Sequence, residues 1–127
     1  MGPAETAIRQ NLRERMMTRA RAHPGFFHVE RFTEDRVYFG SGGRFPRAWI
    51  TWSELEEVVR FLAVRGTVPI STGTYRDPGT LGESLMCCTA LISPWVVAAA
   101  LDVAGIIEVL PGEPKRVRLA HVGRHQP

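Results

Sequence analysis

The sequence of 127 residues is poor in lysine and in cysteine, and it has no long apolar run. Lys115 is the only lysine, so arginine carries almost all of the positive charge, and guanidinium pairs with phosphate in a fork that ammonium cannot copy. Cys87 and Cys88 are neighbours in a predicted helix, where a normal disulfide does not fit, and we expect small core residues in a reducing compartment. No stretch has the length of a bilayer span, and the N-terminus lacks the order of a signal peptide. We therefore expect a cytoplasmic protein.

The usual signatures of enzymes are also missing. The four histidines form no close metal-ligand cluster, and no Gly-x-Ser-x-Gly elbow, paired carboxylates or Cys-His arrangement stands out. A Walker-type phosphate loop needs a Gly-Lys-Ser/Thr end, which the glycine-rich stretch at 40–43 lacks. We expect a protein that is not an enzyme and that uses neither a metal nor a cofactor.

Arginine is what the sequence has in excess. The formal net charge is +3 and the pI is near 9.4, which favours anionic partners such as nucleic acid. A GC-rich genome would also enrich arginine everywhere, so only clusters of arginine support an interface. Five arginines lie in a predicted amphipathic helix from 4 to 22, where they fit either a phosphate backbone or an ordinary solvated face.

The second half of the chain has the element order of a winged helix-turn-helix. The predicted elements are a helix at 53–65, a short edge strand at 68–71, helices at 80–91 and 94–104, and strands at 106–110 and 116–119. Thr51 with Glu54, and Thr80 with Glu83, have the spacing of capping boxes. Ser93 before a proline suits the start of the third helix.

The first half adds a β-hairpin to the predicted N-terminal helix. Aromatic and β-branched residues predict strands at 26–32 and 36–39, followed by a third strand at 48–52. Trp49 and Trp52 are expected in the core. The predicted fold is therefore α+β, a winged-helix-like C-terminal part with an N-terminal helix and a small antiparallel sheet. We expect one DNA-binding domain at 1–120, divided into 1–52 and 53–120, and a tail or linker at 121–127.

The helix in the recognition position offers no arginine, lysine, asparagine or glutamine to a base edge, so DNA contacts must come from elsewhere. The sources that remain are the glycine loop, the wing, the tail at 121–127 and the first helix. Three segments supply candidates, each with a plainer explanation as a turn or a solvated edge. They are Arg44, Phe45 and Arg47 beside the glycines, Tyr75 and Arg76 in a polar loop, and Lys115, Arg116 and Arg118 in the wing.

Several segments of the second half carry a resemblance to a known family. They are 70–73, Tyr75, 78–81, 98–100, 104–108 and 116–119. Together they resemble a small DNA-binding domain at the N-terminus of some bacterial McrA-like HNH proteins. The resemblance implies binding to duplexes that contain 5-methylcytosine. Those proteins continue into a nuclease part, and this chain has no His-Asn-His signature, so the resemblance implies a reader that does not cleave.

Two functions remain open. The first is a module for double-stranded DNA that inserts a loop, with Phe45 as the wedge, and flips a methylated cytosine out of the stack. The second is a winged-helix module that binds another protein or dimerises through its apolar third helix and its wing.

Overall fold

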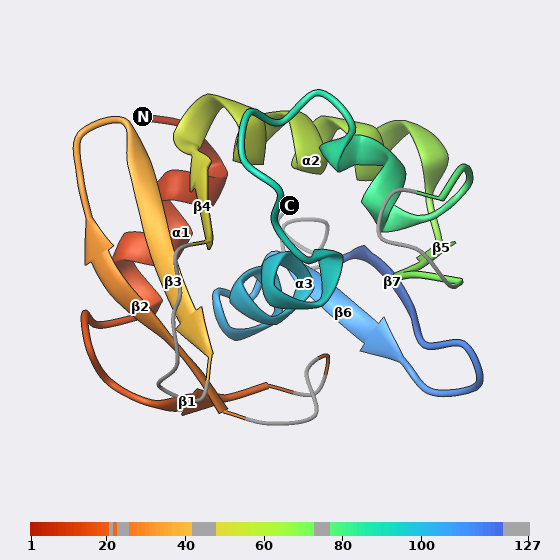
Figure 1. The fold of residues 1–127 in the computed structure, drawn as a ribbon. Helices are drawn as coiled ribbons and strands as arrows, with labels where there is room; N and C mark the ends of the chain where they lie inside the picture. Colours follow the sequence, from red (N-terminus) through yellow and green to blue (C-terminus); the bar gives the residue numbers. More distant parts are fainter. Residues whose placement is uncertain (21, 23–25, 42–47, 73–76, 121–127) are drawn as a thin grey trace, which may run out of the picture.

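The computed structural model describes residues 1–20, 22, 26–41, 48–72 and 77–120. Within them the chain is α+β, as expected, with three α-helices, one short 3-10 helix and two antiparallel sheets. The two sheets lie on opposite sides of α3 (Figure 1). The elements are α1 (Pro3–Asn11), β1 (Thr18–Arg19), β2 (Phe26–Phe32), β3 (Arg36–Ser41), β4 (Ala48–Thr51), α2 (Trp52–Arg65), β5 (Val68–Pro69), the 3-10 helix η1 (Leu81–Leu85), α3 (Pro94–Val103), β6 (Ile107–Leu110) and β7 (Arg116–Leu119).

The predicted N-terminal helix from 4 to 22 is wrong in length. α1 ends at Asn11, and the backbone of Leu12 is already extended. Beyond it the chain runs along β2, where the amide of Arg15 donates to the carbonyl of Val29 at 2.7 Å. Hydrogen bonds to the neighbouring strand therefore replace the helical ones, and Met16, predicted on the apolar stripe, is 52% exposed.

β1 to β4 form a four-stranded sheet in sequence order. The hairpin and the third strand are confirmed, with Val37 opposite Ile50 and Tyr38 opposite Trp49. Because neighbouring residues point to opposite faces, Val37 and Ile50 are buried in the core while Tyr38 and Trp49 lie on the other side.

α2 begins with the predicted capping box. The hydroxyl of Thr51 accepts from the amide of Glu54, and the Glu54 carboxylate accepts from the amide of Thr51. A second carboxylate of this helix reaches the first half of the chain, since Glu56 accepts from the amides of Ala4 and Glu5 at the start of α1. An acid at the N-terminus of a helix satisfies free amides and complements the helix dipole.

The three-stranded sheet has the order β5-β7-β6. β5 lies at its edge, as the proline at position 69 predicted. Helix, short strand, helical segment, helix and two strands follow one another along the chain in the order predicted from the sequence.

The predicted helix at 80–91 is replaced by the short 3-10 helix η1, and its capping box does not form. The hydroxyl of Thr80 donates to the carbonyl of Asp77, and Glu83 instead accepts from the amide of Gly79 and from Arg65. The hydrogen bond from the Gly79 amide and the Arg65 guanidinium together hold the pKa of Glu83 below its usual value. Cys87 therefore lies outside any helix and is exposed, contrary to the expectation of a core residue, and Cys88 is half-buried.

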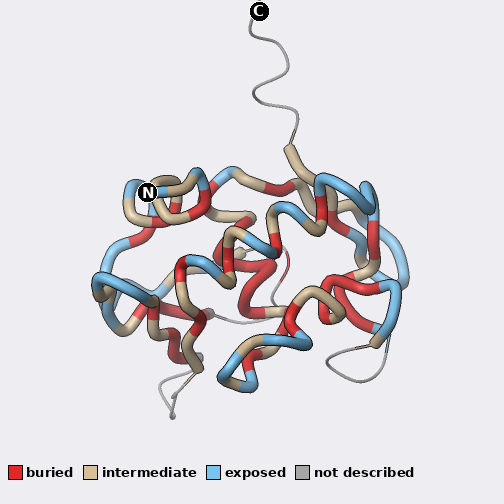
Figure 2. The backbone as a smooth tube through the Cα atoms, turned by 90° about the horizontal axis from the view of Figure 1, so that it is seen from above, coloured by how far each residue is buried: buried red, intermediate tan, exposed pale blue. Residues whose placement is uncertain are grey.

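α3 occupies the middle of the molecule. Ser93 accepts from the amide of Trp95 as the predicted N-cap, and every residue from Val96 to Leu101 is buried. One cluster of buried residues extends from Ala4 to Val117 and so includes both parts of the chain. Figure 2 shows that α3 is almost entirely buried while α1 and α2 expose one side. None of the described helices combines the length and the apolar character that crossing a bilayer requires.

Candidate nucleic-acid interface

The solvent side of the four-stranded sheet carries two aromatic rings and two arginines. We call this surface, formed by Arg31, Arg36, Tyr38 and Trp49, the outer face. Tyr38 and Trp49 are direct cross-strand partners on β3 and β4. The guanidinium carbon of Arg31 lies 4.6 Å from the centre of the Tyr38 ring, and that of Arg36 lies 3.9 Å from the Trp49 ring. Each ring therefore carries a stacked cation, an arrangement that holds a long, flexible side chain in place.

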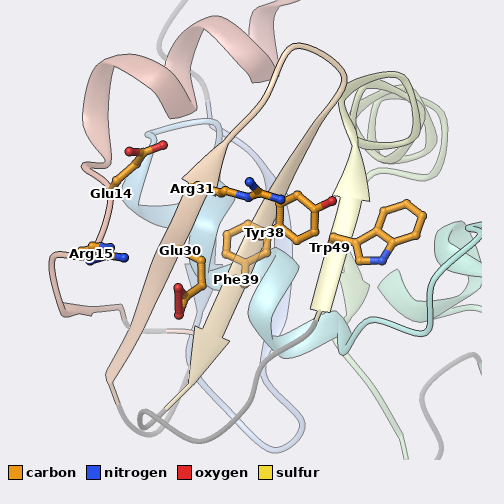
Figure 3. A pocket seen from close by; sticks show the side chains of 7 residues that line it. All are labelled: Glu14, Arg15, Glu30, Arg31, Tyr38, Phe39 and Trp49. Atoms are coloured by element: carbon orange, nitrogen blue, oxygen red, sulfur yellow. The ribbon is translucent and has the colours of Figure 1, made fainter.

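A depression opens on this surface, and Arg31, Tyr38 and Trp49 of the outer face are among the residues that line it (Figure 3). Its volume is about 760 Å³, within the range of small-molecule sites. Two acidic residues, two arginines and the aromatic residues Tyr38 and Trp49 line it, together with Phe39, whose side chain is buried in the core. They are Glu14, Arg15, Glu30, Arg31, Tyr38, Phe39 and Trp49.

The backbone around the depression is irregular at two points. Arg15 has φ of 67°, a left-handed conformation that a residue with a Cβ rarely adopts. The register between β2 and β3 shifts between Val29 and Arg31, so Glu30 is an extra residue that forms a β-bulge. Bulges redirect side chains, and strained residues persist where the surrounding structure holds them. Here the carboxylate of Glu14 helps to hold the segment, because it accepts from the amide of Phe32 at 2.7 Å.

A histidine and a glutamate are paired at the same bulge. Nε2 of His28 lies 2.8 Å from Oε2 of Glu30. The His28 side chain is 11% exposed and that of Glu30 is 42% exposed. Gly40 lies opposite His28 on β3, and its lack of a side chain makes room for the imidazole ring. A Cβ at this position would lie 2.6 Å from Cε1 and 2.7 Å from Nε2 of His28.

Many arginines outside this face are bound to carboxylates. Among the described residues, Arg9 pairs with Glu5, Arg60 with Glu57, Arg65 with Glu83, and Arg118 with Glu108. Arg36 also pairs with Asp35, whose pKa is lowered by the side-chain hydrogen bonds from Arg36 and Thr33. Arg31 differs, because within the described parts of the chain it stacks on Tyr38 and forms no ion pair.

The predicted contact residues are only partly placed. Arg44, Phe45, Arg47, Tyr75 and Arg76 lie outside the described residues. The wing residues are placed on and next to β7, where Arg116 is exposed and Lys115 and Arg118 are half-buried. Arg118 Nε lies 2.6 Å from Oε1 of Glu108 on the neighbouring strand, so the wing carries less free charge than predicted.

The sequence-based prediction of the site missed the outer face. Trp49 was expected in the core with Trp52, but only Trp52 is buried, and its indole N–H donates to the carbonyl of Thr33 at 3.0 Å. The signal that points to the face is the alternation in β3, where Arg36 and Tyr38 are on one side and Val37 and Phe39 are on the other.

Among the residues that the structure describes, no group of three histidine, cysteine or acidic side chains lies close enough together to hold a metal ion. Comparisons of the chain with models of protein families, with curated proteins and with solved structures gave no significant match.

Proposed function

We propose that this chain is a module that binds double-stranded DNA through the outer face of its four-stranded sheet and reads a methylated cytosine that is flipped out of the duplex. The observation that carries the proposal is the pair of arginine–aromatic stacks, Arg31 on Tyr38 and Arg36 on Trp49, side by side on one open surface.

The chemistry of these stacks suits a nucleic acid. A guanidinium that lies flat on a ring keeps its N–H groups at the edge, where they can donate to phosphate oxygens in pairs. An aromatic ring next to them offers a surface for an unstacked base, and such stacking contributes about 1–3 kcal/mol per base. The depression beside Tyr38 has room for one base that has left the helix.

The connection between β3 and β4 contains the remaining candidates of the first half. Arg44, Phe45 and Arg47 lie within residues 42–47, between the two strands that carry Tyr38 and Trp49. In this proposal Phe45 is the wedge that fills the place of the flipped base, and the two arginines bind the phosphates next to it. In the same proposal, secondary contacts to the DNA come from Tyr75, Arg76 and the wing.

A titration of labelled duplexes, with and without one 5-methylcytosine, followed by fluorescence anisotropy at 50 and 200 mM salt, tests the proposal. If the face engages three phosphates, the affinity falls about 40-fold over this range through counterion release. Arg31→Gln reduces the slope of log K against log salt by about one. The matched control is Arg60→Gln, which changes an exposed arginine of α2 that is already paired with Glu57.

The competing function is a module that binds a protein partner or dimerises. Its main support was the apolar third helix, but Val96 to Leu101 are buried against this chain's own core. Absence of DNA binding at 50 mM salt, together with a defined oligomer by light scattering, would favour that function and refute the proposal.

A further inference from the structure

Three unusual features of the first half meet at one place. They are the left-handed backbone of Arg15, the bulge at Glu30 and the buried ring of His28. Arg15 and Glu30 both line the depression, and His28 contacts Glu30 directly. Each feature has a cost in folding free energy, and costs of this kind concentrate where a site must be held in a fixed shape.

The hydrogen bonds of His28 determine how it acts on Glu30. Nδ1 of His28 is buried and has no partner within the described residues, while Nε2 lies 2.8 Å from the carboxylate. A proton on Nδ1 would be a buried donor without an acceptor, which is costly, so the ring proton belongs on Nε2 and is donated to Glu30. The imidazole thus fixes one carboxylate oxygen of Glu30, whose side chain is 42% exposed.

The lining of the depression matches the parts of one nucleotide unit. Arg15 and Arg31 are suited to a phosphate, and the Tyr38 ring is suited to the face of a base. A carboxylate only accepts hydrogen bonds, so Glu30 is suited to an amino group and repels a carbonyl oxygen. In DNA, an exocyclic amino group opposite a carboxylate acceptor is the contact that distinguishes cytosine from thymine.

We infer that Glu30, positioned by His28, accepts a hydrogen bond from the exocyclic amino group of an extruded base, so that the depression selects amino-bearing bases, cytosine or adenine, over thymine or uracil. This inference rests on the proposed function, because the base reaches the depression as part of bound DNA. Gly40 is part of the same site, because the side chain of any larger residue there would displace the His28 ring and with it Glu30.

The test uses duplexes of one sequence with a single unpaired base, either cytosine or thymine, titrated against the full chain. The wild type binds the unpaired cytosine about tenfold more tightly than the unpaired thymine, which corresponds to one well-formed hydrogen bond to a charged acceptor. In Glu30→Gln the new amide can donate to the thymine carbonyl, so the preference disappears or reverses. Glu57→Gln, a matched change on the exposed side of α2, leaves the ratio as it is in the wild type.

His28 is tested through the same ratio, because a purely structural role would weaken binding to both duplexes alike. His28→Leu loses the preference for cytosine, and His28→Gln, which keeps a donor near Glu30, recovers part of it. Circular dichroism and thermal melting confirm that each variant is folded.

Two results would overturn the inference. In the first, the ratio of the affinities for the two duplexes is the same in the wild type and in Glu30→Gln, while DNA binding itself persists. Base selection by Glu30 is then wrong, and the proposed function stands. If the wild type binds neither duplex at 50 mM salt, the proposed function fails and the inference fails with it.

Discussion

Both sheets of this protein carry arginines, and two of these arginines, Arg118 and Arg31, have cross-strand partners of different kinds. On the three-stranded sheet, Arg118 lies directly opposite Glu108 and is bound to it, so the pair adds little net charge to the wing. On the four-stranded sheet, Arg31 lies opposite Tyr38 and stacks on its ring. An aromatic partner orders the guanidinium without cancelling its charge, whereas a carboxylate does both. For this reason we assign the candidate interface to the four-stranded sheet and not to the wing.

The two regions also differ in backbone regularity. β6 and β7 pair without a register shift, while β2 has a bulge and lies next to the strained Arg15. The regular sheet supports the fold, and the irregular one carries the candidate site. The following predictions test this division, beginning with the largest expected effect.

Leu101→Ala should lower the free energy of unfolding by about 3 kcal/mol, because Leu101 is fully buried in α3 and its loss leaves a cavity between the two sheets. Since one core serves both regions, denaturant unfolding should remain a single transition by tryptophan fluorescence and by far-UV circular dichroism. Leu91→Ala is the control, because Leu91 is 71% exposed and its loss should cost less than about 0.5 kcal/mol. Two separate transitions would show that the regions are independent units.

Tyr38→Ala should weaken DNA binding by about tenfold or more, since it removes both the ring and the support of Arg31. Tyr38→Phe keeps the ring and should stay close to the wild type. Anisotropy titrations at one ionic strength compare the two. An equal loss in both variants would place the effect on the hydroxyl and contradict the stacking argument.

Glu54→Gln should destabilise the fold by about 1 kcal/mol at pH 7, because it weakens the capping box of α2 and the hydrogen bonds to Thr89. The change does not alter the outer face or the wing. Burial acts to raise the pKa of Glu54, but hydrogen bonds from Thr51 and Thr89 outweigh it and hold the pKa below its usual value. A carboxylate with a lowered pKa contributes stability above its unfolded pKa and loses that contribution as the pH falls through its folded pKa. The difference in free energy of unfolding between the variant and the wild type should therefore shrink below about pH 4.5. Urea unfolding at pH 7 and pH 3.5 measures this difference. A difference that is larger at pH 3.5 than at pH 7 would contradict the prediction.

Arg118→Gln should change DNA affinity by less than about 0.5 kcal/mol, because its charge is already bound to Glu108. Its effect should be smaller than that of Arg31→Gln under the same conditions. A larger effect at Arg118 would mean that the wing, and not the outer face, is the principal contact.

Local signals in the sequence predicted much of the fold. The capping box at Thr51, the N-cap at Ser93 and the edge position of β5 each depend on residues a few positions apart, and all three formed. The predictions failed where a distant partner competed. Glu83 has the spacing to cap with Thr80, yet it accepts from Gly79 and Arg65, and residues after Asn11 pair with β2 instead of continuing a helix.

The candidate site was harder to predict, because it depends on which residues face each other across strands. The spacing of Arg31, Tyr38 and Trp49 in the sequence does not reveal that they meet, and the bulge at Glu30 changes the register by one residue. Sequence alone also could not distinguish Arg118, which has a carboxylate opposite it, from Arg31, which has a ring.

The most direct test of the account is a map of amide chemical shifts in ¹⁵N-labelled protein during titration with a duplex that contains one 5-methylcytosine. The account predicts that the largest shifts belong to β2, β3 and β4 around Arg31, Tyr38 and Trp49, while β6 and β7 change little. Shifts concentrated on β6 and β7, with β2 to β4 unchanged, would contradict it.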